Sequence, residues 1–314
     1  MADVMITTDK LTKIYNGKTV VKDVSIQIER GSIVGLVGQN GAGKTTLIRM
    51  LTTLVKPTSG SFALLPGRQR DDTTVAAIVE RPSIYNNLTG KDNLIAQSKL
   101  LGLKADNEYL TYTLTLVGLD ASSPKLVKNY SLGMKQRLAI AMTLVGKPEL
   151  LILDEPTNGL DPQGIYDMRE IFVKLNREMG TTILVSSHIL SELSKFATDF
   201  FIMDKGRVLK HISADEIRNL GGKRVKMTVD KTEEAKKVLE QYGKTEIVSS
   251  NEIVLQTESD APITQIMLSL AQAEITVTNV NQMGDSLEEY YIELLKKEKP
   301  TTPPQNFKIN GGSL

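Results

Sequence analysis

The sequence predicts an α/β fold with a mostly parallel core sheet, followed by a small C-terminal α+β domain. Three observations support this prediction. A short apolar run at 32–37 precedes a glycine-rich loop, and residues 46–51 after the loop are apolar at helical spacing. A second apolar run, 150–153, ends in two acidic residues. Beyond residue 223, strand and helix patterns alternate, which is typical of helices packed on one face of a sheet.

The composition is that of a globular protein with enough residues for about two domains. The 314 residues are 40% hydrophobic and 24% charged, and the net charge of +1 gives no overall field that favours nucleic acid or anionic lipid. Cysteine is absent, which excludes disulfides and thiolate metal sites and fits the cytosol. Residues 1–4 show no secretory signal, and no run approaches the roughly 18 apolar residues of a membrane span. We therefore expect any membrane role to come through a partner.

Residues 4–30 are expected to form two or three strands, with a hairpin turn at Asn16-Gly17. Tyr15 stands just before this turn. It is either a strand aromatic packed on its neighbour or a platform on which an adenine ring stacks.

The stretch Gly38–Thr45, followed by Thr46, matches the phosphate-binding pattern G-x-x-x-x-G-K-S/T. A strand, a glycine loop and a helix together surround an anion with backbone N–H groups and the positive end of the helix. Lys44 would reach the β- and γ-phosphates, and the Thr45 hydroxyl would ligate magnesium. The alternative is a glycine-rich turn without a ligand, which the flanking strand and helix disfavour. The sequence thus predicts a nucleoside triphosphate site.

The next part of the chain changes from strands to helices. Strands are expected at 60–65 and 75–79, and a mostly helical segment at about 86–145. Near the end of this segment, Ser131 precedes an alanine- and leucine-rich helix. Ser131 is a natural N-cap, and capping alone would account for it.

Asp154 and Glu155 end a strand that is otherwise apolar. Because unpaired carboxylates are costly near a core, packing alone does not account for them. In a P-loop protein the aspartate at this strand end holds magnesium beside the loop threonine. The adjacent Glu155 is placed to polarise an attacking water.

The remaining core pattern predicts a turn at 156–162, a helix at about 163–179, a strand at 181–186 and a closing hairpin of 200–203 with 207–211. The chain has two histidines. His211 is interpreted as structural. His188 follows the carboxyl end of a parallel strand, where ligand sites of α/β proteins form.

Leu220-Gly221-Gly222 is expected to be a linker, and 223–297 a small accessory domain in which we predict no chemistry. Its predicted elements are strands at 224–229, 245–256 and 275–280, and helices at 232–242, 262–273 and 286–297. The tail, 298–314, carries proline, glycine and polar residues and is expected to be disordered.

Taken together, the segments 38–46, 130–137 and 150–161 with His188 resemble the ATP-binding subunit of an ABC transporter. The resemblance covers about residues 1–220. It implies a P-loop ABC-type nucleotide-binding domain with an antiparallel β subdomain and a helical subdomain at about 86–145. It also implies ATP hydrolysis with ATP and Mg²⁺ (magnesium) bound.

The resemblance gives a role to each motif residue. By it, the Walker A residues around the phosphates are Gly38, Asn40, Gly41, Gly43, Lys44, Thr45 and Thr46. The catalytic residues would be Glu155 as the base, His188 on the γ-phosphate, and Lys44. The metal would be held by Thr45, Asp154 and Glu80. The remaining nucleotide contacts would be Tyr15 on adenine, Asp161 of the D-loop, and Ser131 and Gly133 of the signature segment. That segment departs from Leu-Ser-Gly-Gly-Gln at Leu132 and Met134.

A helix N-terminus with Ser131 and Gly133 is a second anion cradle, but one chain cannot fold it onto its own Walker A loop. The resemblance therefore implies a head-to-tail dimer, expected to be a homodimer, with two ATP molecules between the subunits. The dimer would close with the γ-phosphate present and open after hydrolysis.

Glu80 occupies a position where this family usually has glutamine. A carboxylate can still coordinate the metal, although it adds negative charge beside the phosphates; the alternative is a surface acid after a strand. With Pro82 and residues 87–90, Glu80 resembles the subgroup of exporters for bacitracin and lantibiotics, which includes self-immunity systems.

The leading hypothesis is the energising subunit of such an exporter. The resemblance implies a separate transmembrane permease, gripped near residues 80–95, and a place at the cytoplasmic face of the cell membrane. A second hypothesis changes the cargo to an ion, lipid, polysaccharide or drug. A third is a soluble ABC-type ATPase that acts on ribosomes or DNA. The sequence has a single ATPase domain and no cluster of basic residues along one face, which argues against this third hypothesis. The same observations argue against nucleic acid as a partner.

Overall fold

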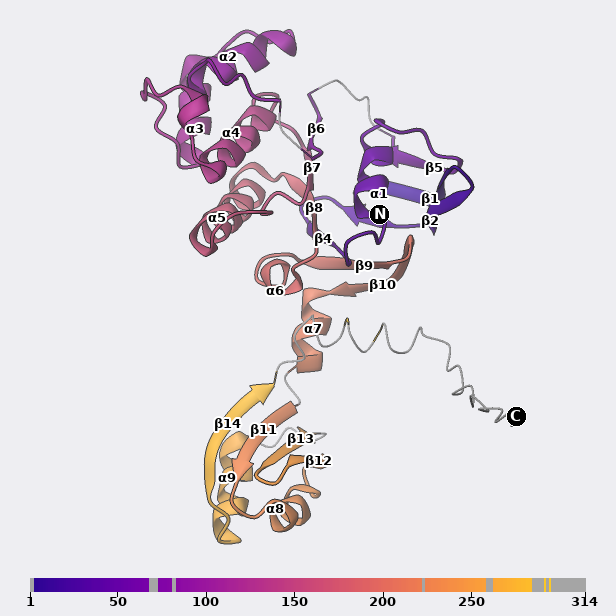
Figure 1. Cartoon of the computed structure of the whole chain (residues 1–314), viewed down its shortest axis with the longest axis vertical. Coiled ribbons are helices and arrows are strands. Elements are labelled where there is room, and N and C mark those ends of the chain that lie inside the picture. The colour runs from indigo at the N-terminus through magenta and orange to yellow at the C-terminus, as the bar shows by residue number, and fades with distance from the viewer. Residues whose placement is uncertain are drawn as a thin grey trace, which may run out of the picture.

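The computed structural model describes residues 3–67, 73–80, 83–221, 224–257, 262–283, 291 and 294 (Figure 1). Several predictions lie outside these residues. They are the contribution of Pro82, the Gly222 end of the linker, the tail 298–314 and most of the predicted helix 286–297. The two described residues of that helix, Tyr291 and Leu294, are helical.

The N-terminal strands form an antiparallel sheet in which β1 pairs with β2, β3 and β5. Its strands are β1 (Val4–Tyr15), β2 (Lys18–Val24), β3 (Gln27–Glu29) and β5 (Ser59–Leu64). The turn between β1 and β2 contains Asn16 and Gly17, both with positive φ, and Tyr15 pairs with Lys18. The hairpin prediction is confirmed, because Asn-Gly is the dipeptide that such a turn favours.

The core sheet has the order β10-β9-β4-β8-β7-β6, and only β10 runs antiparallel to its neighbour. Its strands are β4 (Ile33–Val37), β6 (Val75–Ile78), β7 (Leu150–Asp154), β8 (Thr182–Ser187), β9 (Asp199–Asp204) and β10 (Arg207–Ser213). Every residue of β4, β7 and β8 is buried. Continuous apolar runs of this kind are typical of parallel strands covered on both faces.

Helices cover both faces of this sheet and form a separate group at one edge (Figure 1). They are α1 (Lys44–Leu51), α2 (Gly90–Leu100), α3 (Asn107–Leu116), the short 3₁₀ helix η1 (Val127–Asn129), α4 (Leu132–Leu144), α5 (Pro162–Met179), α6 (Leu190–Leu193) and α7 (Ala214–Gly221). The group α2–α4 is the helical segment that the sequence predicts at 86–145.

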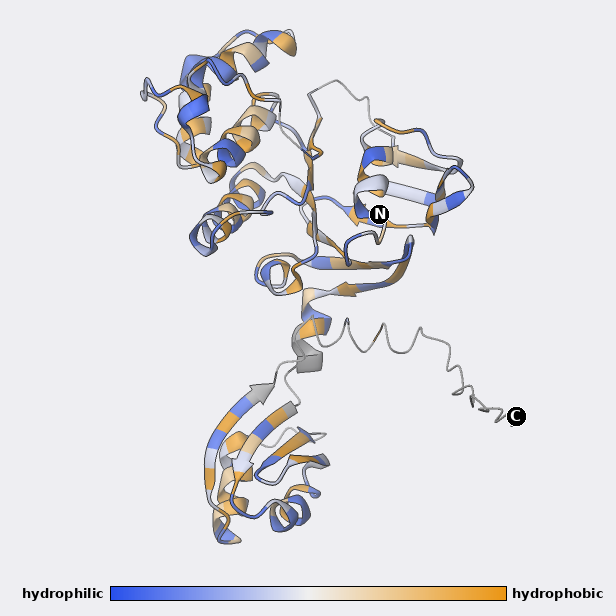
Figure 2. Ribbon diagram, viewed as in Figure 1, coloured by the Kyte–Doolittle hydropathy of each residue, from blue (hydrophilic) through white to orange (hydrophobic). Residues whose placement is uncertain are grey.

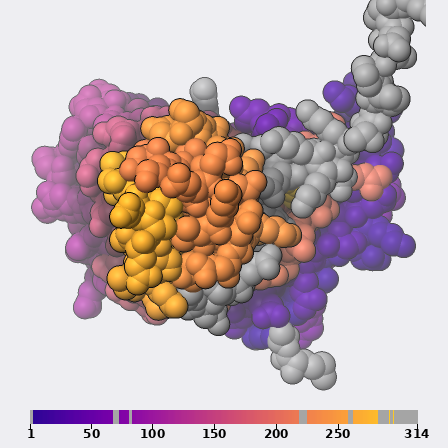
Figure 3. Space-filling model, turned by 90° about the horizontal axis from the view of Figure 1, so that it is seen from below, coloured from indigo at the N-terminus to yellow at the C-terminus, as the bar shows by residue number. Residues whose placement is uncertain are grey.

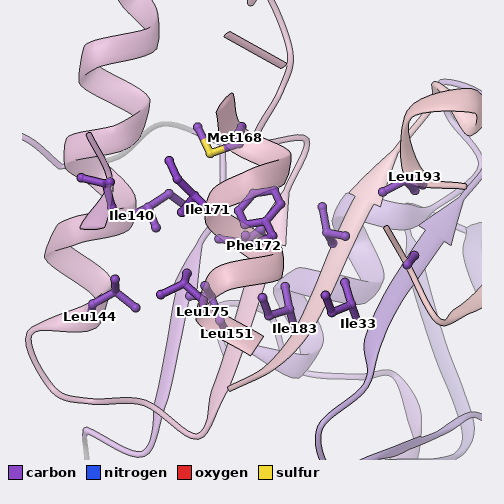
Figure 4. Packing of buried hydrophobic residues seen from close by; sticks show 14 of the residues in the cluster. Ile33, Ile140, Leu144, Leu151, Met168, Ile171, Phe172, Leu175, Ile183 and Leu193 are labelled. Carbon is purple, nitrogen blue, oxygen red and sulfur yellow. The ribbon is translucent and has the colours of Figure 1, made fainter. Parts of the chain in front are cut away.

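Two hydrophobic clusters lie on either side of the core sheet. On one side, Phe172 of α5 packs with Ile140 of α4 and Ile183 of β8 (Figure 4). On the other side, α1 packs between the core sheet and the antiparallel sheet, with Leu47 and Met50 fully buried. The start of α1, where the glycine loop ends, is therefore held on a rigid frame.

The C-terminal part has its own antiparallel sheet, of order β12-β13-β11-β14, and its own hydrophobic cluster. Its elements are β11 (Arg224–Val229), α8 (Thr232–Leu239), β12 (Gly243–Ser249), β13 (Glu252–Thr257), α9 (Ile263–Gln272) and β14 (Val277–Met283). Hydrophobic and hydrophilic residues alternate along its strands (Figure 2), and β14 forms one edge (Figure 3). The predicted α+β alternation is confirmed.

The expected linker at 220–222 differs from the structure, because Leu220 and Gly221 end the helix α7. The Ser213 hydroxyl accepts the Glu216 N–H, while a Glu216 carboxylate oxygen accepts the Ser213 N–H. This reciprocal capping box starts a helix that the sequence analysis did not predict. In the part of the chain that the structure describes, no helix has the length and apolar character to cross a membrane.

Candidate functional site

The phosphate loop joins β4 to α1 at the carboxyl edge of the core sheet. Gly38 is buried, while Asn40 and Gly41 are exposed. Gly43 is the residue before α1 and has φ 104°, and no side chain caps the helix there. The first N–H groups of a helix need partners from outside it, so an uncapped start is suited to an anion.

Close backbone contacts fix the position of this loop. A Cβ atom on Gly43 would lie 2.8 Å from the Val20 carbonyl oxygen, and one on Gly206 would lie 2.4 Å from the same oxygen. Gly206 belongs to the turn between β9 and β10 and also has positive φ. Only glycine lets these three backbones meet, because any side chain would push them apart.

Lys44 is 5% exposed, which is rare for a lysine unless it has partners. Its ammonium donates to the Gly38 carbonyl at 2.7 Å and lies 3.1 Å from a Glu155 carboxylate oxygen. Thr45 and Thr46 follow at the start of α1, half-buried. A cation is thus held at the loop in a place of low solvent access.

Glu155 is the point at which the predicted catalytic residues meet. One of its carboxylate oxygens contacts Lys44, and the other lies 2.5 Å from Nδ1 of His188. Glu155 has φ 49°, a conformation that costs a non-glycine residue energy and is common at functional sites. The structure therefore brings together Lys44, Glu155 and His188, which lie on three different segments.

Sequence reasoning missed Ser186, which connects both acids to the neighbouring strand. Its hydroxyl donates to Asp154 Oδ1 at 2.7 Å and accepts the Glu155 N–H at 2.9 Å. Ser186 is fully buried. A small polar residue near the end of an apolar buried strand was the signal that could have revealed it, since buried hydroxyls need partners.

Glu80 is exposed and forms an ion pair with Arg49 of α1. It also lines a cavity of about 30 Å³ together with Asp154, Glu155 and Gln136. This volume is enough for water. Among the described residues, no three His, Cys, Asp or Glu side chains are grouped as a metal site. A metal here would therefore need further ligands, such as a threonine hydroxyl and phosphate oxygens.

The signature residues form a separate feature. Ser131 is exposed and caps α4 by accepting the Met134 N–H at 3.2 Å, which confirms its predicted capping role. Gly133 faces Leu160 of the D-loop, and Asp161 caps α5 by accepting the Gly164 N–H. Within the described ranges, no hydrogen bond or ion pair joins these residues to the phosphate loop.

Tyr15 lies at the exposed end of β1. The Lys13 ammonium stands 4.9 Å from the centre of its ring. The ring thus packs against a neighbouring side chain and remains accessible, so adenine stacking stays a prediction.

A protein-family model described as "ABC transporter" matches residues 21–158, which contain the phosphate loop, Asp154 and Glu155. A second model, described as "AAA domain, putative AbiEii toxin, Type IV TA system", matches residues 124–194.

Curated relatives match over much more of the chain. The bacitracin transport ATP-binding protein BcrA of Enterococcus faecalis is 36% identical over 297 residues, which cover 93% of this chain and 96% of BcrA. The lantibiotic transport ATP-binding protein SrtF of Streptococcus pyogenes is 41% identical over 219 residues, which cover 69% of this chain and 94% of SrtF.

Among solved structures, CbiO1 of Clostridium perfringens, part of the ABC transporter complex CbiONQ, superposes with a TM-score of 0.62. It is 26% identical, and the match covers 68% of this chain and 90% of CbiO1. The predicted α/β fold is that of an ATP-binding cassette. On the identity and coverage of these relatives, the chain belongs to the ABC transporter family as an ATP-binding subunit.

Proposed function

We propose that this subunit binds and hydrolyses ATP at the Gly38–Thr46 loop and thereby energises export of bacitracin- or lantibiotic-type peptides, for resistance or self-immunity. The observation that carries the proposal is the arrangement of Glu155, held between Lys44 and His188 at the mouth of the loop. This arrangement places a cation that can bind phosphate, a carboxylate that can act as a base, and a histidine next to one another.

The residues of the loop fit a polyphosphate. An uncapped helix start offers N–H donors, and the buried Lys44 ammonium offers a charge-assisted hydrogen bond. We infer that Lys44 exchanges its bond with the Gly38 carbonyl for phosphate oxygens when ATP binds. Gly38, Asn40, Gly41, Gly43, Thr45 and Thr46 form the rest of this proposed cradle.

Hydrolysis then depends on Glu155. Once Lys44 engages phosphate, the Glu155 carboxylate is released to orient a water molecule and accept its proton. His188 keeps its contact with the second oxygen of Glu155 and so fixes the direction in which the base points. Magnesium, when bound, neutralises phosphate charge, and the residues that would hold it are Thr45, Asp154 and Glu80. Asp154 is already oriented by Ser186.

A second copy of the chain would complete the site. Ser131 and Asp161 are exposed helix caps, and Gly133, in the first turn of α4, is half-buried. We propose that they contact the γ-phosphate held by a partner subunit in a head-to-tail homodimer. Tyr15 would stack on the adenine.

The proposed cargo follows the relatives. BcrA is a bacitracin transport protein and SrtF a lantibiotic transport protein by their names, and BcrA matches nearly the whole of this chain. Glu80 in place of glutamine is the residue that the sequence analysis associated with this subgroup. Another cargo, such as an ion, lipid, polysaccharide or drug, is the runner-up, because the ATPase subunit itself does not contact cargo.

A groove of about 420 Å³ supports docking of a transmembrane permease at the cytoplasmic face of the membrane. It lies between β6 and the helices α2 and α4, and its apolar lining includes Leu54, Val75, Ala77, Val79, Leu101 and Met142. Leu54 is 65% exposed, which is unusual for a large apolar side chain unless a partner covers it. We propose that a cytoplasmic helix of the permease binds here.

The test is co-purification from the native host. A tagged Glu155→Gln protein, purified in detergent with ATP and magnesium, should retain a stoichiometric polytopic membrane protein that mass spectrometry identifies. Deletion of the gene for that protein should then raise sensitivity to bacitracin or a lantibiotic. Unchanged sensitivity would contradict the hypothesis of a peptide cargo, while the hypothesis that the subunit energises an exporter would stand.

Two matched surface variants test the groove. Leu54→Asp should abolish capture of the membrane protein, whereas Leu268→Asp on α9, where the leucine is 60% exposed, should not. Both variants should keep basal ATPase activity. Recovery of ribosomes or DNA instead of a membrane protein would overturn the transporter proposal and favour a soluble ATPase.

A further inference from the structure

A hydrogen bond joins the described C-terminal part of the chain to the phosphate loop. The hydroxyl of Tyr291 accepts a hydrogen bond from the backbone N–H of Gln39 at 3.2 Å, across 252 positions of sequence. Tyr291 is 5% exposed and belongs to the hydrophobic cluster of the ATP-binding core, not to the cluster of the C-terminal sheet. Leu294 packs against the same core cluster.

The peptide unit that Tyr291 contacts is the one that holds Lys44. Its N–H belongs to Gln39 and its carbonyl to Gly38, and this carbonyl accepts from the Lys44 ammonium at 2.7 Å. Because a peptide unit is planar, fixing the direction of its N–H also fixes the direction of its carbonyl. Tyr291 and Lys44 therefore hold the same peptide from opposite sides.

The environment keeps the Tyr291 hydroxyl in its neutral form. Burial raises the pKa of Tyr291, the Gln39 N–H opposes this rise, and the nearby Asp204 carboxylate adds to it. Because Tyr291 is buried, breaking its bond to the Gln39 N–H would leave a buried hydroxyl without this partner, so the contact resists being broken.

We propose that Tyr291 is a positioning residue for the phosphate loop. By holding the Gly38–Gln39 peptide, it keeps the loop in the conformation that accepts polyphosphate and so raises the affinity for ATP. The residues beyond the C-terminal sheet thereby act on the nucleotide site, although the sequence analysis predicted no chemistry in that part of the chain. The inference rests on the proposed role of Gly38–Thr46 in ATP binding.

The experiment compares the full-length protein with Tyr291→Phe, which removes only the hydroxyl. We expect KM and the dissociation constant for ATP to rise about 2- to 10-fold, the effect of one hydrogen bond, with kcat within about twofold of the wild type. The matched control is Tyr242→Phe, which removes a hydroxyl bonded to Ser269 in the C-terminal cluster. It should leave all three constants unchanged.

Two other outcomes would overturn the inference. If Tyr291→Phe lowers the melting temperature and kcat but leaves KM and ATP affinity unchanged, the role of Tyr291 is structural only. If Tyr242→Phe weakens ATP binding as much as Tyr291→Phe, the effect is not specific to the loop. A Lys44→Ala protein that binds ATP like the wild type would instead refute the proposed function itself.

Discussion

The chain contains two helix N-termini at which an anion is expected, and they differ in how far one subunit completes them. The start of α1 is buried, has no side-chain cap and stands beside the Lys44 cation. The start of α4 is exposed, and Ser131 caps it with its own hydroxyl. The first site has donors ready for phosphate within one chain. The second is already capped within its own chain, so we expect a nucleotide held by a partner subunit to bind and leave it reversibly.

The largest effect should come from Glu155, which serves the first site alone. Glu155→Gln should lower kcat by about 100- to 10,000-fold, because glutamine cannot accept a proton from water. ATP affinity should not fall, and the dimer should stay closed. Phosphate release and size-exclusion chromatography with ATP measure both. Hydrolysis at the wild-type rate would exclude Glu155 as the base.

The variant with the next largest effect tests whether the α1 site binds ATP without the α4 site of a partner subunit. Lys44→Ala should weaken ATP binding roughly 10- to 100-fold, since it removes a charge-assisted hydrogen bond to phosphate. Titration of a fluorescent ATP analogue at concentrations where the protein is monomeric measures this loss. Affinity within twofold of the wild type would mean that phosphate is held elsewhere.

A smaller effect distinguishes the second site from the first. Ser131→Ala should lower the ATPase rate roughly tenfold while monomer ATP affinity stays unchanged, because the lost hydroxyl would contact the partner's nucleotide. Loss of the cap should also cost about 1 kcal/mol of stability.

The control for Ser131 is Asp106→Ala, which removes the exposed N-cap of α3 in the same group of helices. It should destabilise the protein by a similar amount and leave the ATPase rate as it is. An equal loss of activity in both variants would show that Ser131 acts only as a cap.

The smallest effect is expected at Glu80. Glu80→Gln should keep ATPase activity within about threefold of the wild type, because an amide oxygen can also ligate magnesium and the exposed ion pair with Arg49 contributes little. Arg49→Gln breaks the same pair from the other side and serves as its control. A complete loss of activity in Glu80→Gln alone would show that the carboxylate has a role that an amide cannot fill.

Local patterns predicted the elements better than the contacts between them. Strands at 33–37, 150–154 and 182–187 were predictable because buried parallel strands are continuous apolar runs. The helix α7 was missed because its start depends on the capping box of Ser213 and Glu216 and not on a long apolar pattern.

The sequence predicted candidate site residues one by one, but not how they are arranged. Motif spacing identified Lys44, Glu155 and His188, yet their mutual contacts depend on the register of parallel strands, which no local pattern specifies. The hydrogen bond between Tyr291 and Gln39 could not be predicted from the sequence, because no motif requires a tyrosine at 291 or a glutamine at 39.

The turn glycine Gly206 has a consequence for genetic variation. A Cβ atom added at Gly206 would meet the same Val20 oxygen as one added at Gly43, so any amino-acid substitution here would press a side chain against the strand that supports the loop. Gly206 lies outside the nucleotide-binding motifs, so a substitution there, judged by motifs alone, would be classified as a benign loop change. The backbone contact predicts instead that it inactivates the subunit as severely as a variant at Gly43.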